Sequence, residues 1–381
     1  MKTATASVLL LLTLAGAQSF GQGSLTPPPG PPAPTMKTLD QLEPRTVVNA
    51  TTTPGDAANT FIISASGSYY LTSNLTGEAN KHGISIQASE VTLDLNGFTL
   101  VSGGGADLRG IAVPAAQKNF SIRNGTVRGW TGGGVRAESV RNVVAEKLRL
   151  SDNTGSIGIY VGLGSLVKDC AANANGTGIR TPDRCQVISC ISTENTGNGF
   201  ECGAYVSLLD CTSSRNAGYG FQVGGSNSLA RCSATRNDVD GILAGLGCSI
   251  SECVANMNVV DGISASEANI LRSVATSNGK DGIVSISGNV SACDASRNGR
   301  NGISGIAVSV NESTAHSNVS NGISAPAGGA RNCTANSNGD HGISTDGVIA
   351  FCRALLNNTN NSGSLDINGV GATRTGNKPA P

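Results

Sequence analysis

The sequence predicts an all-β chain, a single-stranded parallel β-helix of about 12–14 coils that follows an N-terminal cap. Three periodic features predict this fold. A glycine followed by an apolar residue recurs every 20–24 residues, and an asparagine and a cysteine recur with nearly the same period. Short stretches of alternating apolar and polar residues, typical of strands, lie between turn-forming Asn, Gly, Asp and Ser residues.

The first segment of the chain predicts a secretory signal at residues 1–17. Lys2 supplies the positive start, an apolar run follows, and Ala15-Gly16-Ala17 fits a small-residue cleavage site, although the cut could fall as late as residue 21. The apolar run is too short to span a bilayer. We therefore expect a protein that is secreted, periplasmic or on the cell surface, without a transmembrane segment.

The composition divides the rest of the chain into four segments. Residues 18–35 are rich in proline, which favours an extended spacer. We expect residues 36–82 to form the N-terminal cap, which would cover the open end of the solenoid, and residues 83–370 to form the β-helix. Residues 371–381 carry no apolar pattern and predict a disordered tail.

The glycine–apolar pair recurs from Gly110-Ile111 to Gly342-Ile343. Coils of a parallel β-helix stack about 4.8 Å apart, so residues one period apart should lie above one another. We expect the apolar residues to point into the core and the glycines to supply backbone φ angles that other residues resist. Leucine-rich repeats have a similar period, but leucine is not the repeated letter here.

The asparagine column runs from Asn175 to Asn358. At a turn, stacked amide side chains can bond to one another and to backbone groups that the turn leaves unpaired. We therefore predict a structural asparagine ladder, whose regular part is Asn237, Asn258, Asn278, Asn298, Asn318 and Asn338.

Two segments carry a family resemblance: Asn278-Gly279-Lys280-Asp281-Gly282-Ile283, and the sequence VTLDLNGFTL at residues 91–100. They resemble the right-handed parallel β-helix repeat family of the pectate-lyase-like superfamily, over about residues 60–370. The resemblance implies a right-handed helix, which is also the general hand of parallel crossovers. The family includes polysaccharide lyases, glycoside hydrolases, epimerases, phage tailspikes and uncharacterised secreted repeat proteins, and the chain looks most like the last group.

The composition of the chain and the absence of several motifs narrow the range of possible functions. The chain has 26 basic and 26 acidic residues, which argues against an extended nucleic-acid footprint, and aromatic residues make up only 3%. The zinc-protease, phosphate-loop and nucleophile-elbow motifs are absent from the sequence. We expect no cofactor, with calcium as the single exception considered below.

Eleven cysteines occur in a chain that we expect to be exported. Eight of them keep the repeat period, and neighbours held one coil apart are too distant for a disulfide. We interpret these eight as small buried fillers. Cys185, Cys202 and Cys248 lie off the column and are the better candidates for a bridge.

The position after the repeated apolar residue holds the candidate glycan-binding residues Tyr160, Arg180, Glu201 and Gln222 on adjacent coils. Aromatic and charged groups on an outward strand face could grip a neutral or acidic extracellular polysaccharide. The alternative is an Arg180–Glu201 pair between coils with no ligand.

The position before the repeated glycine holds Asp240, Asp261 and Asp281 on consecutive coils. Carboxylates about 5 Å apart suit a retaining glycosidase pair or a calcium site. The alternative is structural, because Asp and Asn before Gly form turns. No cysteine or histidine cluster suggests another metal.

These observations favour a secreted, non-catalytic scaffold or carbohydrate-binding rod. The alternative is a polysaccharide lyase or glycoside hydrolase, which export, the family resemblance and the aspartate column support. The plain Ser, Ala and Asn faces of residues 262–345 favour the first interpretation.

Overall fold

The computed structural model describes residues 43–114, 117–360, 363, 366–369 and 374–375. The signal at residues 1–17 and the spacer at 18–35 lie outside these residues. From Arg45 onward the chain is a β-solenoid in which every pairing between strands is parallel. The fold is therefore the predicted all-β parallel β-helix, and no helix occurs in the described residues.

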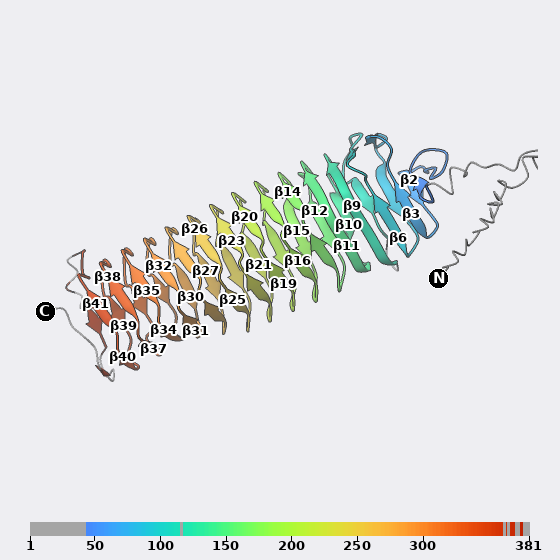
Figure 1. Cartoon of the computed structure of the whole chain (residues 1–381). Coiled ribbons are helices and arrows are strands. Elements are labelled where there is room, and N and C mark those ends of the chain that lie inside the picture. The colour runs from blue at the N-terminus through green and yellow to red at the C-terminus, as the bar shows by residue number, and fades with distance from the viewer. Residues whose placement is uncertain (1–42, 115–116, 361–362, 364–365, 370–373, 376–381) are drawn as a thin grey trace, which may run out of the picture. The chain divides into compact units, whose positions relative to one another are not determined.

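A fifteen-stranded sheet receives one strand from each coil, so the solenoid has fifteen coils, slightly more than predicted (Figure 1). The strand pairing of this sheet already begins at residue 59, inside the segment of residues 36–82 that was expected to form the N-terminal cap. The strands of this fifteen-stranded sheet are β2 (Asn59–Ile63), β5 (His82–Ile86), β8 (Arg109–Ala112), β10 (Gly133–Ala137), β12 (Ile157–Val161), β15 (Thr177–Thr181), β18 (Phe200–Cys202), β21 (Phe221–Val223), β24 (Ile242–Ala244), β27 (Ile263–Ala265), β30 (Ile283–Ser285), β33 (Ile303–Ser304), β36 (Ile323–Ser324), β39 (Ile343–Ser344) and β42 (Ile367–Asn368).

A twenty-eight-stranded sheet forms the rest of the wall as two neighbouring ladders. The first ladder contains β1 (Thr46–Val47), β3 (Gly67–Tyr70), β6 (Val91–Asp94), β9 (Lys118–Arg128), β11 (Arg141–Ser151), β13 (Leu166–Lys168), β16 (Gln186–Ile188), β19 (Ser207–Leu209), β22 (Ser228–Ala230), β25 (Ser249–Ser251), β28 (Asn269–Leu271), β31 (Ser287–Ser291), β34 (Ala307–Asn311), β37 (Gly329–Arg331), β40 (Ile349–Ala350) and β43 (Arg374–Thr375).

The second ladder shares the long strands β9 and β11 with the first, which joins the two into one sheet. Two residues of the expected tail, in β43, pair with β40. The other strands of the second ladder are β4 (Leu75–Thr76), β7 (Thr99–Val101), β14 (Ala171–Asn173), β17 (Ile191–Thr193), β20 (Thr212–Ser214), β23 (Ser233–Thr235), β26 (Val254–Asn256), β29 (Val274–Thr276), β32 (Asp294–Ser296), β35 (Thr314–His316), β38 (Thr334–Asn336) and β41 (Arg353–Leu355).

The predicted stacking of the repeated residues is confirmed. Ile263 is the register partner of Ile283, and Ile283 is the partner of Ile303. All three side chains are fully buried. Burial of such a side chain contributes about 1.5–3 kcal/mol, so the column is a main source of stability.

The repeated glycines have a different role from the predicted one. Gly282 and its equivalents do not have a positive φ. A Cβ atom at Gly282 would instead lie 2.5 Å from Nδ2 of Asn298 and 2.6 Å from the Gly302 carbonyl oxygen. Glycine is required because the next coil approaches this backbone too closely for a side chain.

The asparagine ladder is present and buried. Nδ2 of Asn278 donates to Oδ1 of Asn298 at 3.0 Å, and the backbone N–H of Asn278 donates to the same oxygen at 3.0 Å. The ladder begins at Asn153, earlier than predicted. Its last asparagine is Asn357, not the predicted Asn358, because the final repeat is one residue shorter.

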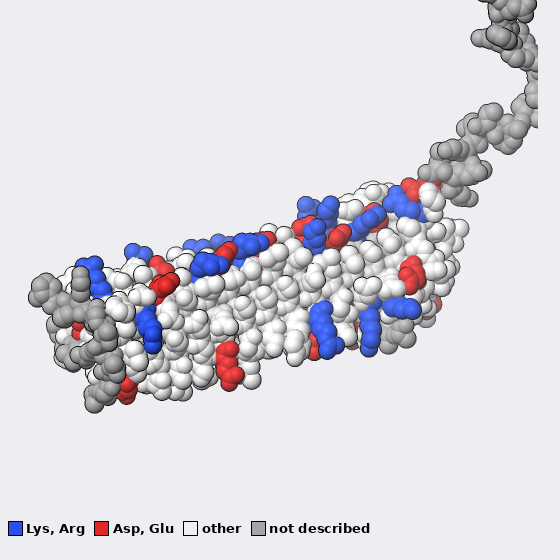
Figure 2. Space-filling view, turned by 60° about the horizontal axis from the view of Figure 1, so that its bottom comes forward, with Lys and Arg blue, Asp and Glu red and all other residues white. Residues whose placement is uncertain are grey.

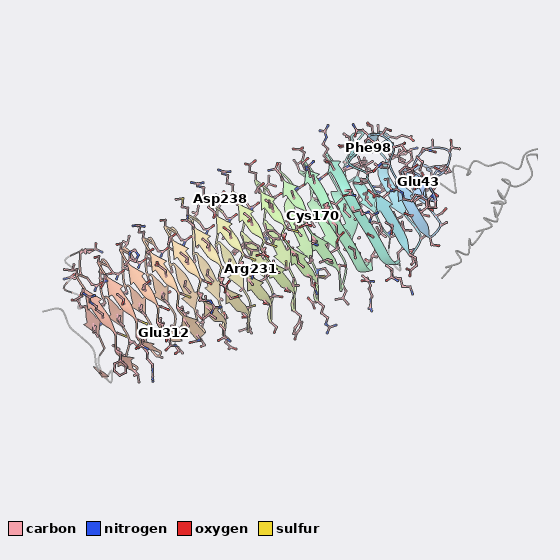
Figure 3. The ribbon with its side chains drawn as sticks, in the orientation of Figure 1. Glu43, Phe98, Cys170, Arg231, Asp238 and Glu312 are labelled. Atoms are coloured by element: carbon pink, nitrogen blue, oxygen red, sulfur yellow. The ribbon has the colours of Figure 1, made fainter. Side chains whose placement is uncertain are left out.

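A corner between the two ladders is held by residues with a left-handed backbone. Asp210, Arg231, Glu252 and Arg272 have φ values of 54°, 51°, 54° and 46°. Their exposed side chains alternate in charge, and they pair between coils: Arg231 lies 2.7 Å from Asp210, and Arg272 lies 3.0 Å from Glu252. Figure 3 labels Arg231 on this surface, and Figure 2 shows that charged side chains gather in rows beside a broad uncharged face.

Candidate functional site

The four candidate glycan-binding residues form one straight row on the outside of the fifteen-stranded sheet. Tyr160, Arg180, Glu201 and Gln222 are consecutive register partners on β12, β15, β18 and β21. Each is partly exposed, while the apolar residue before each of them is buried. We call this set the outer row.

Tyr160 lies between two guanidinium groups. The Cζ atom of Arg180 is 5.0 Å from the centre of the tyrosine ring, and that of Arg136 is 5.7 Å away on the preceding coil. Arg136 is held by Glu138, at 2.8 Å, and it donates to Oγ of Ser156 at 3.2 Å. These contacts fix the ring through cation–π attraction.

Arg136 was missed by the sequence analysis. It occupies the same repeat position as Tyr160 and is its register partner in β10. The preceding Gly134-Val135 pair could have revealed it, because this pair belongs to the repeated glycine–apolar series.

The charges of the outer row are balanced within it. Nη2 of Arg180 lies 2.9 Å from Oε1 of Glu201. Oε1 of Gln222 accepts a hydrogen bond of 2.7 Å from Asn198. The predicted Arg180–Glu201 pair therefore forms, and it leaves other donor and acceptor positions of both groups open.

A shallow hollow of about 190 Å³ lies beside this pair. Tyr160, Arg180 and Glu201 line it together with the turn at Pro182 and Gly203. Beyond Gln222 the same outward position is Leu243, Ser264 and Val284 on the next coils. The polar and aromatic groups are thus confined to a few neighbouring coils.

The aspartate column, Asp240, Asp261 and Asp281, binds the backbone of the following coils. Oδ1 of Asp240 accepts the N–H of Asp261 at 3.0 Å, and Oδ1 of Asp261 accepts the N–H of Asp281 at 2.9 Å. Asn301 makes the same bond to the N–H of Asn321, at 3.2 Å. This is the turn-forming arrangement that the sequence analysis weighed against an acid–base pair or a calcium site.

The three carboxyl groups differ in acidity. Burial raises the pKa of Asp240 and of Asp261, and the next carboxylate in the column adds to this rise. Burial alone would also raise the pKa of Asp281, but hydrogen bonds from Arg300, the Asn301 N–H and Ser304 lower it. No group of three or more His, Cys, Asp or Glu residues in the described part of the chain is arranged to hold a metal ion.

All eleven cysteines are buried and free, including Cys185, Cys202 and Cys248. The candidate bridge among these three is therefore not formed. Burial raises the pKa of Cys202 to about 12 and that of Cys293 to about 11. Cys170, labelled in Figure 3, belongs to the filler column.

Part of the chain matches a known family model. The family model described as right handed beta helix region matches residues 60–209. No curated protein matches the chain. Within the residues that the structure describes, no helix has the length and hydropathy needed to cross a membrane.

Several solved structures are similar to the chain at low identity. The Dettilon tailspike protein is 13% identical, with a TM-score of 0.39; the match covers 70% of this chain and 60% of the tailspike. The periplasmic alginate epimerase AlgG is 13% identical, with a TM-score of 0.43 and coverage of 87% and 80%. The mannuronan C-5 epimerase AlgE4 A-module of Azotobacter vinelandii is 12% identical, with a TM-score of 0.35 and coverage of 83% and 91%.

Proposed function

We propose that this chain, a right-handed parallel β-helix protein, is a secreted, non-catalytic rod that binds an extracellular polysaccharide along its outer row. Export rests on the signal predicted at residues 1–17. The central observation is the in-register alignment of Tyr160, Arg180, Glu201 and Gln222 beside a surface hollow.

The chemistry of the outer row suits a sugar chain. Arg180 offers guanidinium donors, Glu201 offers carboxylate acceptors, and Gln222 offers both kinds of group. Sugar hydroxyls can donate to Glu201 and accept from Arg180, while Tyr160 contributes a rigid, partly apolar surface. Because Arg136 and Arg180 hold the ring in place, little conformational entropy is lost when a ligand binds.

The geometry around the carboxylates favours binding over catalysis. Asp240, Asp261 and Asp281 each use one carboxylate oxygen for a backbone N–H of the next coil. Arg180, the basic residue nearest to the polar hollow, is paired with Glu201. Before one of these side chains could act as the base of a lyase or the acid of a hydrolase, its contact would have to break.

An alternative is a polysaccharide lyase or a glycoside hydrolase. The raised pKa values of Asp240 and Asp261 support it, because a general acid must remain protonated near neutral pH. This alternative predicts product formation, whereas the proposed rod predicts binding alone.

The test combines binding and turnover on one panel of neutral and uronic-acid polysaccharides. We expect at least one polymer to be retained in affinity electrophoresis, with no new reducing ends and no absorbance from unsaturated products. Tyr160→Ala and Arg180→Gln should each weaken this binding about tenfold, whereas Arg272→Gln, on another face, should not. Product formation would establish an enzyme, and binding that is unaffected by both outer-row variants would refute the proposed site.

A further inference from the structure

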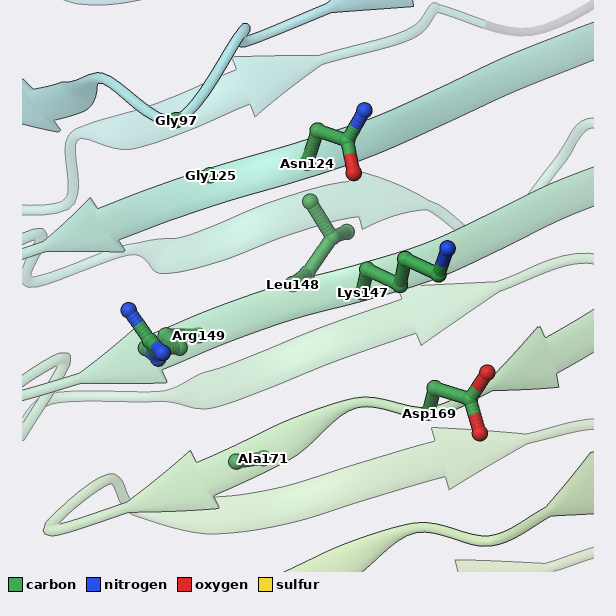
Figure 4. A pocket seen from close by; sticks show the side chains of 8 residues that line it. All are labelled: Gly97, Asn124, Gly125, Lys147, Leu148, Arg149, Asp169 and Ala171. Carbon is green, nitrogen blue, oxygen red and sulfur yellow. The ribbon is translucent and has the colours of Figure 1, made fainter.

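A second hollow, of about 360 Å³, lies on the other sheet at the corner between the two ladders (Figure 4). It is within the usual size range of ligand pockets. Its walls and floor are formed by Asn124, Lys147, Leu148, Arg149, Asp169 and Ala171. We call it the basic hollow.

Two glycines, Gly97 and Gly125, line the basic hollow. Gly125 on β9 cannot carry a side chain, since a Cβ atom there would lie 2.3 Å from Cβ of Leu95 in the core. Gly97 has a φ of 83° with nothing within 4 Å of a Cβ position, so its side faces open space. Gly97 therefore leaves room where a side chain would otherwise stand, whereas Gly125 allows the backbone of β9 to pack closely on Leu95.

The floor is apolar and the walls are charged. Leu148 is only 1% exposed and is the register partner of Gly125. Lys147 and Arg149 flank Leu148 on β11, and they lie on opposite sides of it (Figure 4). Asp169 lies on the next coil, on the same side as Lys147.

The charges of the basic hollow are unsatisfied, unlike those farther along the same corner. Among the described residues, the side chains of Lys147, Arg149 and Asp169 form no ion pair within 4.0 Å. Arg231 and Asp210, in the same left-handed corner position as Lys147 and Asp169, are bound at 2.7 Å. The hollow therefore separates charges that the fold brings into contact elsewhere.

The surrounding coils also carry an excess of positive charge. Residues 109–149 contain eight lysine and arginine residues and two glutamates, on a chain whose formal net charge is zero. Such a local excess attracts anions and raises their rate of association.

We propose that the basic hollow binds a sugar residue that carries an anionic group, either a carboxylate or a sulfate ester. The anionic group contacts the ammonium of Lys147 and the guanidinium of Arg149, which favour charge-assisted bonds to oxyanions. Sugar hydroxyls donate to the carboxylate of Asp169, and the C–H face of the ring packs against Ala171. The site lies on a different sheet from the outer row and does not depend on it.

Titration calorimetry on the full chain tests the proposal with four probes. Two are anionic tetrasaccharides, one with glucuronate carboxylates and one with sulfate esters; the others are cellotetraose and a single-stranded DNA tetramer. We expect one anionic tetrasaccharide to bind, the neutral sugar and the DNA to bind at least tenfold more weakly, and the affinity to fall with salt. Which anionic probe binds identifies the charged group.

Variants at the corner between the two ladders locate the site. Lys147→Gln and Arg149→Gln should each weaken binding of the anionic probe about tenfold. Arg231→Gln, which removes the same charge at the same corner, should leave it unchanged. The proposal is wrong if neither anionic probe binds, if cellotetraose or DNA binds equally well, or if Lys147→Gln and Arg149→Gln bind like the unmodified chain.

Discussion

Arg300 donates through Nε to the carboxylate of Asp281 at 2.7 Å, and its Nη2 donates to the second oxygen. Asp281 has no exposed surface, whereas the side chain of Arg300 is 54% exposed. This contact distinguishes Asp281 from Asp240 and Asp261, since neither of those two side chains forms an ion pair with an arginine or lysine among the described residues.

We expect Asp281→Asn to lower the free energy of unfolding by about 1–3 kcal/mol at pH 7, because the charge-assisted bonds are lost. The lowered pKa of Asp281 means that its contribution is present above the ordinary value of 3.8 and is lost as the pH falls through the folded-state pKa. Urea unfolding should therefore show a large difference in the free energy of unfolding between variant and parent at pH 7 and a small difference at pH 3. An equal difference at both pH values would contradict the ion-pair explanation.

Asp240→Asn and Asp261→Asn should leave stability at pH 7 unchanged or increase it. The amide oxygen can accept the same backbone N–H, as Asn301 does in this column. Since the folded-state pKa values are raised, these two carboxyl groups contribute most to stability below the ordinary value, and their contribution is lost as the pH rises through the folded pKa. Thermal unfolding from pH 3 to pH 7 should show this loss in the parent but much less in the double variant. Marked destabilisation by both substitutions, with lost glycan turnover, would favour the enzyme alternative.

Asn298→Ala should lower the free energy of unfolding by about 2–4 kcal/mol, because buried groups lose their partners. Oδ1 of Asn298 accepts from both the side chain and the backbone of Asn278, and its Nδ2 donates to Asn318 and to the Ala275 carbonyl. Asn269→Ala, at an exposed position, is the matched control and should change stability by less than about 0.5 kcal/mol. Equal urea midpoints for the two variants would mean that the ladder does not stabilise the coils.

Gly282→Ala should destabilise the chain by more than about 3 kcal/mol or prevent folding, because the new Cβ would collide with Asn298 and Gly302. Gly164→Ala provides the comparison. Gly164 has a φ of 70° and open space around a Cβ position, so only backbone strain of about 1 kcal/mol applies. Circular dichroism melting measures both variants, and similar losses would contradict crowding between coils as the reason for the repeated glycines.

All eleven cysteines should react with a thiol reagent after denaturation without a reductant, since all eleven are free. In the folded protein the reaction should be slow, because burial hides the thiols and raises the pKa of Cys202 and Cys293. Nine or fewer titratable thiols in freshly purified, unfolded protein would indicate a disulfide and contradict the structure.

Periodic features of the fold could be predicted from the sequence, because a stacked coil repeats the same environment. The alignment of Ile263, Ile283 and Ile303 is an example, since each isoleucine occupies an equivalent buried position. The reason for the glycines could not be read in this way. Glycine would recur in the sequence whether it supplied a left-handed backbone or allowed a close approach between coils, and only the structure distinguishes these two causes.

The candidate sites were predictable only in part, because ligand-binding surfaces interrupt a repeat instead of following it. The outer row could be found as a column, but the contact of Arg136 with Tyr160 depends on side-chain directions. The basic hollow could not be found at all. It arises from the absence of a side chain at Gly97 and from the separation of Lys147 and Asp169, and neither feature recurs with the period.

Between β15 and β39, the difference between coils of 20 and 21 residues is confined to one turn. Four residues separate β24 from β25, whereas three separate β27 from β28, and the strands on both sides keep their register. This turn accordingly absorbs small insertions without shifting the columns on either side. Longer insertions are also accommodated, because the register partners Ile84 and Ile111 lie 27 residues apart and Ile111 and Val135 lie 24 apart. The length of a coil can therefore vary during evolution while the columns of its core keep their register.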